Sequence, residues 1–136
     1  MTTIACNKDV MAADSQATAS NRSSKVVKIF RVNGDIIGCS GTVEDWLIFV
    51  EWYKNKTSPP ELDSDFGALV LTRDGTIYEY GNKLMKMEIF EDFYAIGSGS
   101  DIAIGAMSVG ADPKQAVKIA AKFDVYTGEP VKTFKR

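Results

Sequence analysis

Two turn signals constrain the fold of this chain more than any other feature. They are the dipeptides Asn33-Gly34 and Asp74-Gly75, each of which lies between two segments with the apolar pattern of a strand. Asn-Gly and Asp-Gly accept the positive φ values that a type I′ turn requires. The sequence therefore predicts two β-hairpins. Their strands are Lys25–Val32 with Asp35–Ser40, and Phe66–Leu71 with Thr76–Tyr80.

Further short strands are predicted on both sides of these hairpins. They are Thr2–Asn7, Val10–Asp14, Leu84–Ile89, Phe93–Ile96 and Val131–Phe134. Strands followed by one helix, more strands and then two helices form segregated runs rather than alternating βαβ units. This order predicts an α+β layered fold.

Three segments have helical periodicity instead. In the first, from residue 43 to 56, a stripe of apolar residues predicts the buried face: Val43, Trp46, Leu47 and Val50. Thr42 precedes it as the expected N-cap, with Asp45 three residues later. The second helix is predicted within Ser100–Gly110. The third, Pro113–Phe123, begins after Asp112, and its small residues predict close packing.

Length and composition limit the classes of protein that fit. A chain of 136 residues suits one domain, here residues 1–136, and 45% hydrophobic with 25% charged residues is typical of a globular protein. The net charge of −2 predicts no nucleic-acid partner, and the chain has no apolar run of the roughly 20 residues needed to span a membrane. Two cysteines and the absence of a signal-peptide pattern favour the cytoplasm.

The chain contains no histidine. This excludes Ser-His-Asp and Cys-His catalysis, His-ligated metals and imidazole acid/base steps. Two cysteines are also too few for a Cys-only structural zinc site, which needs about four. If the protein is an enzyme, an amine, a carboxylate or water must move the proton.

Thr2 offers one such amine. Methionine followed by a small residue is a usual substrate for Met removal, and loss of Met1 leaves Thr2 with a nucleophilic hydroxyl and a free α-amine. The reference pKa of an α-amine, about 7.7–8.0, leaves part of it neutral near pH 7. Many proteins begin Met-Thr, however, so this feature alone does not distinguish a nucleophile from an ordinary first residue.

Six short motifs, taken in order, indicate more. They are Thr2-Thr3-Ile4, 13–18 (ADSQAT), 25–29 (KVVKI), 38–41 (GCSG), 96–100 (IGSGS) and 124–128 (DVYTG). Together they resemble the proteasome β-subunit family of N-terminal nucleophile hydrolases, and within it the bacterial HslV-type peptidases. The resemblance covers nearly the whole chain. It implies a four-layer αββα sandwich.

The resemblance also implies roles for the matching residues. Thr2 resembles the nucleophile, Lys25 the catalytic lysine, Asp14 the acid that pairs with it, and Gly41 the oxyanion-hole residue. The other implied roles are a polar network around the nucleophile's amine (Ser98, Asp124 and Thr127), substrate-backbone binding (Thr18) and lining of the specificity pocket (Ala17, Cys39 and Val43). Backbone carbonyls of Ala121, Asp124 and Thr127 are implied ligands of a structural monovalent cation, with no other cofactor.

The implied function is a threonine-type endopeptidase acting on polypeptides. Its implied assembly is a homo-oligomeric ring, with an ATP-dependent unfoldase as a possible partner. Two alternatives stay open at this stage: a non-catalytic or zymogen-like structural homologue that forms a ring, and a small-amide amidase or acylase of the same fold. The chain departs from the family pattern in one place, because the segment between residue 56 and Phe66 is too short and proline-rich for a second helix. One helical layer is therefore expected to be reduced.

Overall fold

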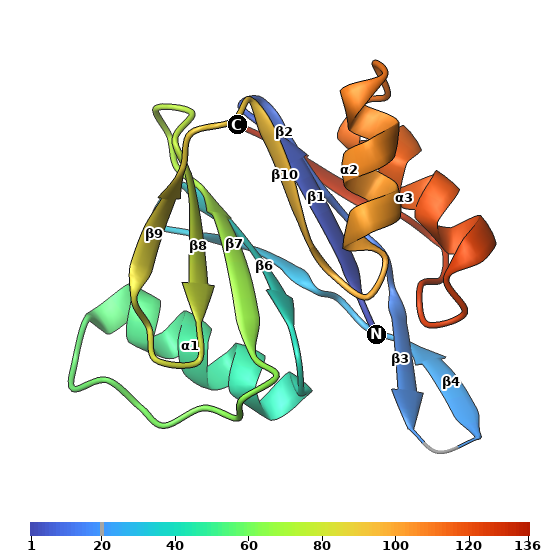
Figure 1. Ribbon diagram of the computed structural model, residues 1–136. Helices are drawn as coiled ribbons and strands as arrows, with labels where there is room; N and C mark the ends of the chain where they lie inside the picture. Colours follow the sequence, from blue (N-terminus) through green and yellow to red (C-terminus); the bar gives the residue numbers. More distant parts are fainter. Residues whose placement is uncertain (20) are drawn as a thin grey trace.

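The computed structural model describes residues 1–19 and 21–136, whose strands form three sheets (Figure 1). A five-stranded antiparallel sheet has the order β5 (Ile29–Val32), β6 (Asp35–Ser40), β7 (Gly67–Leu71), β8 (Ile77–Gly81) and β9 (Lys86–Ile89). A four-stranded sheet has the order β10 (Phe93–Gly97), β1 (Thr3–Asn7), β2 (Val10–Ala13) and β11 (Lys132–Lys135). The third is a small hairpin of β3 (Gln16–Ala19) and β4 (Arg22–Lys25).

The four- and five-stranded sheets pack face to face, and the core between them is apolar. It includes Ile4 and Met11 from one sheet and Ile36 and Leu69 from the other, all at most 1% exposed. Gly38 lets the sheets approach closely, because a Cβ there would lie 2.5 Å from the Ile4 side chain. Both predicted hairpins are present. Asn33 and Gly34 both have positive φ, as a type I′ turn requires, whereas in the second hairpin Gly75 has positive φ and Asp74 does not, so that turn is of another type.

Three helices cover the outer faces of these sheets, as Figure 1 shows. Helix α1 (Val43–Asn55) lies on the five-stranded sheet, and α2 (Ser100–Ser108) with α3 (Pro113–Phe123) lies on the four-stranded sheet. The predicted cap of α3 is present as a full capping box between Asp112 and Gln115. The described residues thus form a mixed fold of sheets and three helices, as the α+β prediction requires.

Helix α1 buries only part of the predicted face, because Trp46 and Val50 pack inward whereas Val43 and Leu47 do not. Trp46, Phe49 and Tyr53 are at most 7% exposed, whereas Leu47 is 59% and Val43 43% exposed. The aromatic side chains decide the orientation, because Phe49 packs against Phe66 and Tyr80 with ring centroids 5.1 and 5.2 Å apart. Aromatic side chains bury more apolar area than Val or Leu, so their spacing sets the inward face. The prediction that Leu47 and Val43 face the core was wrong.

The predicted strand Lys25–Val32 is also two strands rather than one. Strand β4 ends at Lys25 in the small hairpin, and β5 begins at Ile29 in the five-stranded sheet. Between them the Val26 N–H donates to the Ser15 carbonyl, and Lys28 turns its side chain into the protein interior. This break determines which lysine reaches the candidate site.

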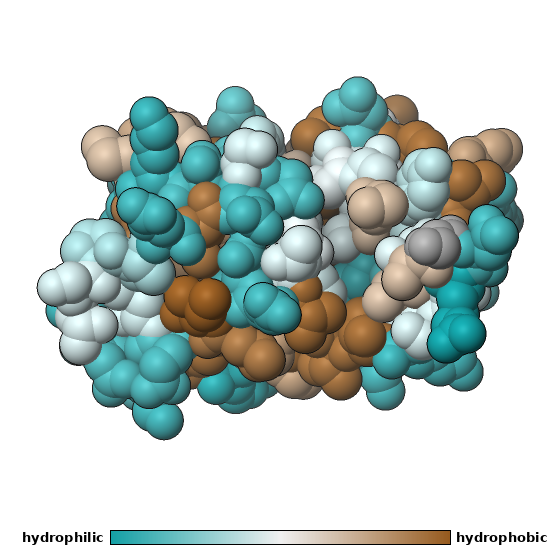
Figure 2. Space-filling model, turned by 90° about the horizontal axis from the view of Figure 1, so that it is seen from below, coloured by the Kyte–Doolittle hydropathy of each residue, from teal (hydrophilic) through white to brown (hydrophobic). Residues whose placement is uncertain are grey.

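The segment after α1 forms no helix, as predicted from its prolines. The Thr42 hydroxyl caps α1 by accepting the Asp45 N–H, whereas the Asp45 carboxylate accepts the Asp63 N–H and so holds this segment. Without a second helix, apolar residues of α1 remain exposed: Val43, Leu47 and Ile48. Figure 2 shows the molecule from below the view of Figure 1, and apolar side chains gather on this face. Among the described helices, none is long and apolar enough to cross a membrane.

Candidate active site

Thr2 directly precedes β1. The N-terminal end of β1 lies near the β3–β4 hairpin (Figure 1). It is 2% exposed, and Thr3 pairs with Gly97 of β10. Gly97 has φ 101°, and a Cβ there would lie 2.0 Å from the Thr2 carbonyl oxygen. Only glycine combines this conformation with so close an approach. Gly97 therefore fixes the backbone of Thr2.

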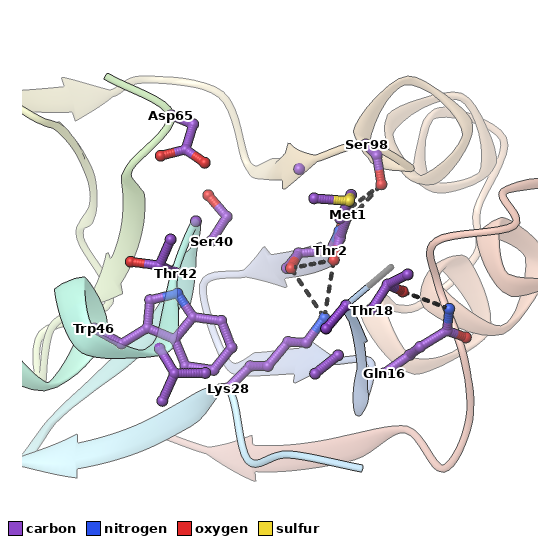
Figure 3. A pocket seen from close by; sticks show the side chains of 15 residues that line it. Met1, Thr2, Gln16, Thr18, Lys28, Ser40, Thr42, Trp46, Asp65 and Ser98 are labelled. Atoms are coloured by element: carbon purple, nitrogen blue, oxygen red, sulfur yellow. Dashed lines mark hydrogen bonds between the residues drawn. The ribbon is translucent and has the colours of Figure 1, made fainter. Parts of the chain in front are cut away.

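A buried ion pair lies against the Thr2 hydroxyl. Lys28 Nζ is 2.9 Å from Thr2 Oγ1 and 2.9 Å from Asp14 Oδ1, and the two charged side chains are at most 1% exposed (Figure 3). Burial lowers the pKa of Lys28, and the neighbouring Asp14 carboxylate opposes this shift. A cation held here stabilises negative charge that develops on the Thr2 oxygen.

Lys25, the lysine predicted to contact Thr2, is not at this site. It is exposed at the end of β4 and pairs with Gln16 across the hairpin. The strand is interrupted between Lys25 and Ile29, so the second lysine of the KVVKI motif, Lys28, points inward instead. The structure corrects the prediction from Lys25 to Lys28. The motif itself was relevant, but its alternation gave no signal that distinguished the two lysines.

Asp14 occupies the predicted position beside a lysine. It directly follows β2, and its carboxylate also accepts the backbone N–H groups of Thr3 at 3.0 Å, Gly128 at 3.0 Å and Gln16 at 3.3 Å. These bonds compensate for the burial of its charge. Asp14 therefore joins the lysine to β1, to β3 and to the segment after α3.

A second polar network lies on the other side of Thr2. The Thr2 N–H donates to Ser98 Oγ at 3.1 Å, and Ser98 Oγ donates to Asp124 Oδ2 at 2.6 Å. Thr127 Oγ1 also donates to Asp124 Oδ2 at 2.6 Å. Burial raises the pKa of Asp124, but the hydrogen bonds from Ser98, Thr127 and Tyr126 outweigh it, so the pKa lies below its usual value. Ser98, Asp124 and Thr127 thus lie together near the Thr2 nitrogen, as predicted.

Met1 is attached to Thr2 in this structure and lies in the same site (Figure 3). Its carbonyl oxygen accepts the Thr2 hydroxyl at 2.6 Å and the Lys28 ammonium at 3.2 Å. The nitrogen of Thr2 is therefore an amide here. Burial lowers the pKa of the Met1 α-amine, an effect to which Lys28 adds and which Asp124, Asp14 and Asp65 oppose.

A pocket of about 550 Å³ opens beside Thr2 and Lys28. Three of the residues predicted to bind substrate line it, namely Ala17, Thr18 and Val43. The sequence did not single out Trp46 or Asp65 for this role, although both also line it (Figure 3). Trp46 was placed on the helix, but only the fold brings that part of α1 next to Thr2.

Cys39 does not line this pocket. It is fully buried beneath α1, on the face of β6 that packs against the helix. Burial alone raises the pKa of its thiol far above the usual range. The alternation of β6 turns Cys39 into the core, so its predicted role in the specificity pocket was wrong.

Gly41 lies at the pocket, directly after β6. Its φ is 101°, and a Cβ would lie 3.1 Å from the Phe66 Cα. Glycine is therefore required both by the backbone conformation and by the closeness of the neighbouring chain. This places a backbone N–H in the wall of the pocket that contains Thr2.

The predicted cation ligands lie at the end of α3 and in the segment after it. The Asp124 carbonyl already accepts the Thr127 N–H at 3.1 Å, and Ala121 is in the last turn of the helix. A monovalent cation coordinated by the carbonyls of Ala121, Asp124 and Thr127 stays a prediction.

Comparison with known protein families and with curated proteins gives no match. Solved structures do match. Thiobacillus denitrificans BPH has a TM-score of 0.81 and 22% identity over 98% of this chain and 97% of that chain. The same protein in complex with epoxomicin has a TM-score of 0.75 and 21% identity over 99% and 97% of the two chains. Eukaryotic HslV from Trypanosoma brucei has a TM-score of 0.77 and 21% identity over 98% and 99%.

These matches include the part of the chain that forms the site. The similarity extends over nearly the whole of each chain, including the strands and helices that position Thr2, Asp14 and Lys28. The chain therefore has the fold of HslV-type, proteasome-like proteins.

Proposed function

We propose that the chain is a threonine-type endopeptidase of the proteasome/HslV kind, with Thr2 as its N-terminal nucleophile after removal of Met1. In this proposal the layers of the fold form the four-layer αββα sandwich of N-terminal nucleophile hydrolases. One observation carries the proposal: Lys28 Nζ lies 2.9 Å from both the Thr2 hydroxyl and the Asp14 carboxylate, in a buried site beside a pocket. A buried lysine needs its partners, and here one partner is a nucleophile.

The first step forms a bond between Thr2 Oγ1 and the carbonyl carbon of a peptide. The hydroxyl proton passes to the free α-amine of Thr2, directly or through water, and the Lys28 ammonium stabilises the oxygen as it loses the proton. The electron pair of the carbonyl moves to its oxygen. The Gly41 N–H is the proposed donor to that oxyanion.

The second step breaks the C–N bond of the peptide. The protonated α-amine returns its proton to the leaving amine, and the acyl group remains as an ester on Thr2 Oγ1. Water then attacks the ester, the same amine takes a proton from the water, and Thr2 Oγ1 leaves with that proton. Every proton transfer uses the Thr2 amine, so the reaction needs no histidine.

The polar network beside Thr2 supports the amine as the base. Ser98 Oγ uses its own hydrogen to donate to Asp124, so toward the Thr2 nitrogen it can only accept. A neutral amine that donates one N–H to Ser98 keeps its lone pair free for the hydroxyl proton. The Thr2 nitrogen lies in the same site as the Met1 α-amine, whose pKa burial lowers.

The pocket is the proposed site for substrate residues next to the cleaved bond. Ala17 and Val43 offer apolar walls, and Thr18 on β3 offers backbone groups to an extended peptide. Epoxomicin is the compound bound in the BPH complex, so it is the first compound to test on this pocket.

A homo-oligomeric ring is the proposed assembly. Support comes from Val43, Leu47 and Ile48 of α1, which are 42–59% exposed and offer an apolar face to a second copy. An ATP-dependent unfoldase is the proposed partner. The cytoplasm is the proposed location, because both cysteines are free and buried.

A second candidate is a zymogen-like or non-catalytic homologue that retains Met1. The Met1 carbonyl accepts hydrogen bonds from both the Thr2 hydroxyl and the Lys28 ammonium. With Met1 attached the Thr2 nitrogen is an amide, so this form has no free base at Thr2. The two candidates differ in the N-terminus of the mature protein.

The experiment compares protein that begins at Thr2 with protein that retains Met1, both verified by intact mass. Each is incubated with epoxomicin and with fluorogenic peptides and small acyl-amides. The proposal predicts a covalent adduct and peptide cleavage only for protein that begins at Thr2. Cleavage of acyl-amides without peptides would indicate the amidase alternative, and no reaction of either form would indicate the non-catalytic one.

A further inference from the structure

Thr3 has a buried hydroxyl that the mechanism above does not use. The residue is 0% exposed, and its Oγ1 lies 2.7 Å from Thr127 Oγ1. A hydroxyl in the first strand of a sheet is often no more than a satisfied polar group in the core. Here its partner already belongs to the network near the Thr2 nitrogen.

The directions of the hydrogen bonds in this network can be assigned. Asp124 is ionised and can only accept, so Ser98 and Thr127 each use their single hydroxyl hydrogen to donate to Asp124 Oδ2. Thr127 therefore has no hydrogen left for Thr3, and Thr3 Oγ1 must be the donor in their 2.7 Å contact. The chain of hydroxyls runs from Thr3 through Thr127 to Asp124, and Ser98 joins Asp124 to the Thr2 nitrogen.

Gly99 gives an independent sign that the space around this contact is specified. Its φ is −94°, which any residue adopts, so the backbone does not require glycine. The space does, because a Cβ at Gly99 would lie 2.1 Å from Thr3 Oγ1 and 3.2 Å from Thr127 Oγ1. Any larger residue would push the two hydroxyls out of contact.

Thr3 also connects the two polar networks through its backbone. Its N–H donates to Asp14 Oδ1 at 3.0 Å, the same oxygen that accepts Lys28 Nζ. The Thr3 amide thus holds Asp14, the partner of Lys28, and the Thr3 hydroxyl contacts Thr127, the partner of Asp124. Thr2 lies between these two groups.

We propose that Thr3 is a positioning residue: its hydroxyl donates to Thr127 and thereby holds Asp124 and Ser98 in the orientation that leaves the Thr2 amine available as a base, in space that Gly99 provides. This inference rests on the proposed function for the role of the amine. The charged groups that act on the Met1 α-amine in this site are Asp124, Lys28, Asp14 and Asp65, and the inference for the Thr2 α-amine concerns only Asp124.

The test is an NMR titration of the α-amine in protein that begins at Thr2 and carries ¹⁵N-threonine. Thr3→Val removes the hydroxyl at nearly constant volume, and Thr3→Ser restores it. Loss of the donor makes the Asp124 carboxylate more basic, so the pKa of the nearby amine is expected to rise in Thr3→Val and to return toward the wild-type value in Thr3→Ser.

Peptide hydrolysis is measured on the same samples. The expected loss of kcat in Thr3→Val is about fivefold, the size of one net hydrogen bond, with KM unchanged and the acid limb of the rate profile at higher pH. Gly99→Ala is expected to reproduce these effects in the wild-type background. It should add less in a Thr3→Ala background, where the 2.1 Å clash is absent and the contacts with Ala120 Cβ at 3.1 Å and Thr127 Oγ1 at 3.2 Å remain.

An unchanged amine pKa in a folded Thr3→Val protein would overturn the inference, as would a Thr3→Ser protein that behaves like Thr3→Val. The titration needs no turnover, so it decides on Thr3 even if the wild-type protein cleaves nothing. Absence of cleavage with the expected pKa shift would overturn only the peptidase function.

Discussion

The floor and the walls of the pocket are built from different kinds of interaction. The floor is formed by Thr2, Lys28 and Ser98, which line the pocket, and by Asp14 and Asp124 behind them. Hydrogen bonds of 2.6–3.1 Å join these residues, and the Lys28–Asp14 pair is almost fully buried. The walls are apolar or exposed side chains from the β3–β4 hairpin and the start of α1. In the proposed function, chemistry depends on the hydrogen-bonded floor and recognition depends on the walls. The predictions below test this division.

Thr2→Ala should have the largest effect. Loss of the nucleophile is expected to reduce peptide hydrolysis by on the order of 10⁶-fold, while Thr2→Ser retains measurable activity because it keeps a hydroxyl. Both are measured with fluorogenic peptides on protein free of Met1. A Thr2→Ala protein that still cleaves would show that the floor is not the catalytic site.

Lys28→Ala tests whether the lysine of the floor, rather than Lys25 of the β3–β4 hairpin, is the one that the reaction needs. It removes the cation from the Thr2 hydroxyl, with an expected rate loss of about 10²–10⁴-fold. It also leaves Asp14 buried without its partner, at a cost in unfolding free energy of about 3–5 kcal/mol. Rates and urea denaturation report the two effects.

Lys25→Ala is the matched control for that variant. Lys25 is exposed and distant from the floor, so activity and stability should change by about twofold or less. A large loss of rate in Lys25→Ala with normal Lys28→Ala kinetics would reverse the assignment made from the structure.

Gly41→Ala should reduce the rate through its backbone. A Cβ at φ 101° and 3.1 Å from the Phe66 Cα must shift the loop and with it the proposed oxyanion donor. The expected loss in kcat is about 10²–10³-fold, the usual value for one such donor. If kcat is unchanged and only stability falls, Gly41 is a turn residue alone.

Asp124→Asn should change the pH profile more than the maximal rate. The Asp124 carboxylate raises the pKa of the Met1 α-amine and is linked to the Thr2 nitrogen through Ser98, so its removal is expected to lower the pKa of the α-amine of protein that begins at Thr2. Because the amine acts in its neutral form, the acid limb of kcat/KM should move to lower pH. A limb that stays in place would indicate that Asp124 does not act on the base.

Val43→Ala should have the smallest effect, confined to binding. Val43 is a wall residue at 43% exposure, and its truncation should change KM for bulky peptides by about fivefold or less and leave kcat intact. A fall in kcat comparable to that of Gly41→Ala would mean that walls and floor are coupled.

Sequence patterns predicted most of the fold because they are local. The Asn33-Gly34 and Asp74-Gly75 turns and the Asp112 cap depend on residues a few positions apart, and all three are present. The positions of Thr2, Asp14, Ser98 and Asp124 followed from ordered motifs.

The errors concern side-chain direction, which distant partners decide. Lys28 is buried because Asp14, from another strand, lies opposite it, and nothing within the KVVKI motif reveals this. Cys39 lies in a strand and Leu47 in a helix, and the packing of α1 on its sheet turns Cys39 inward and Leu47 outward. Local alternation cannot choose between such faces.

The most direct test of the central claim is the rate of peptide hydrolysis by one preparation before and after enzymatic removal of Met1, with the first residue verified by mass. If the Thr2 amine is the base, the form with Met1 is inactive, and activity rises in proportion to the fraction of chains that begin at Thr2. Equal activity of the two forms would contradict it.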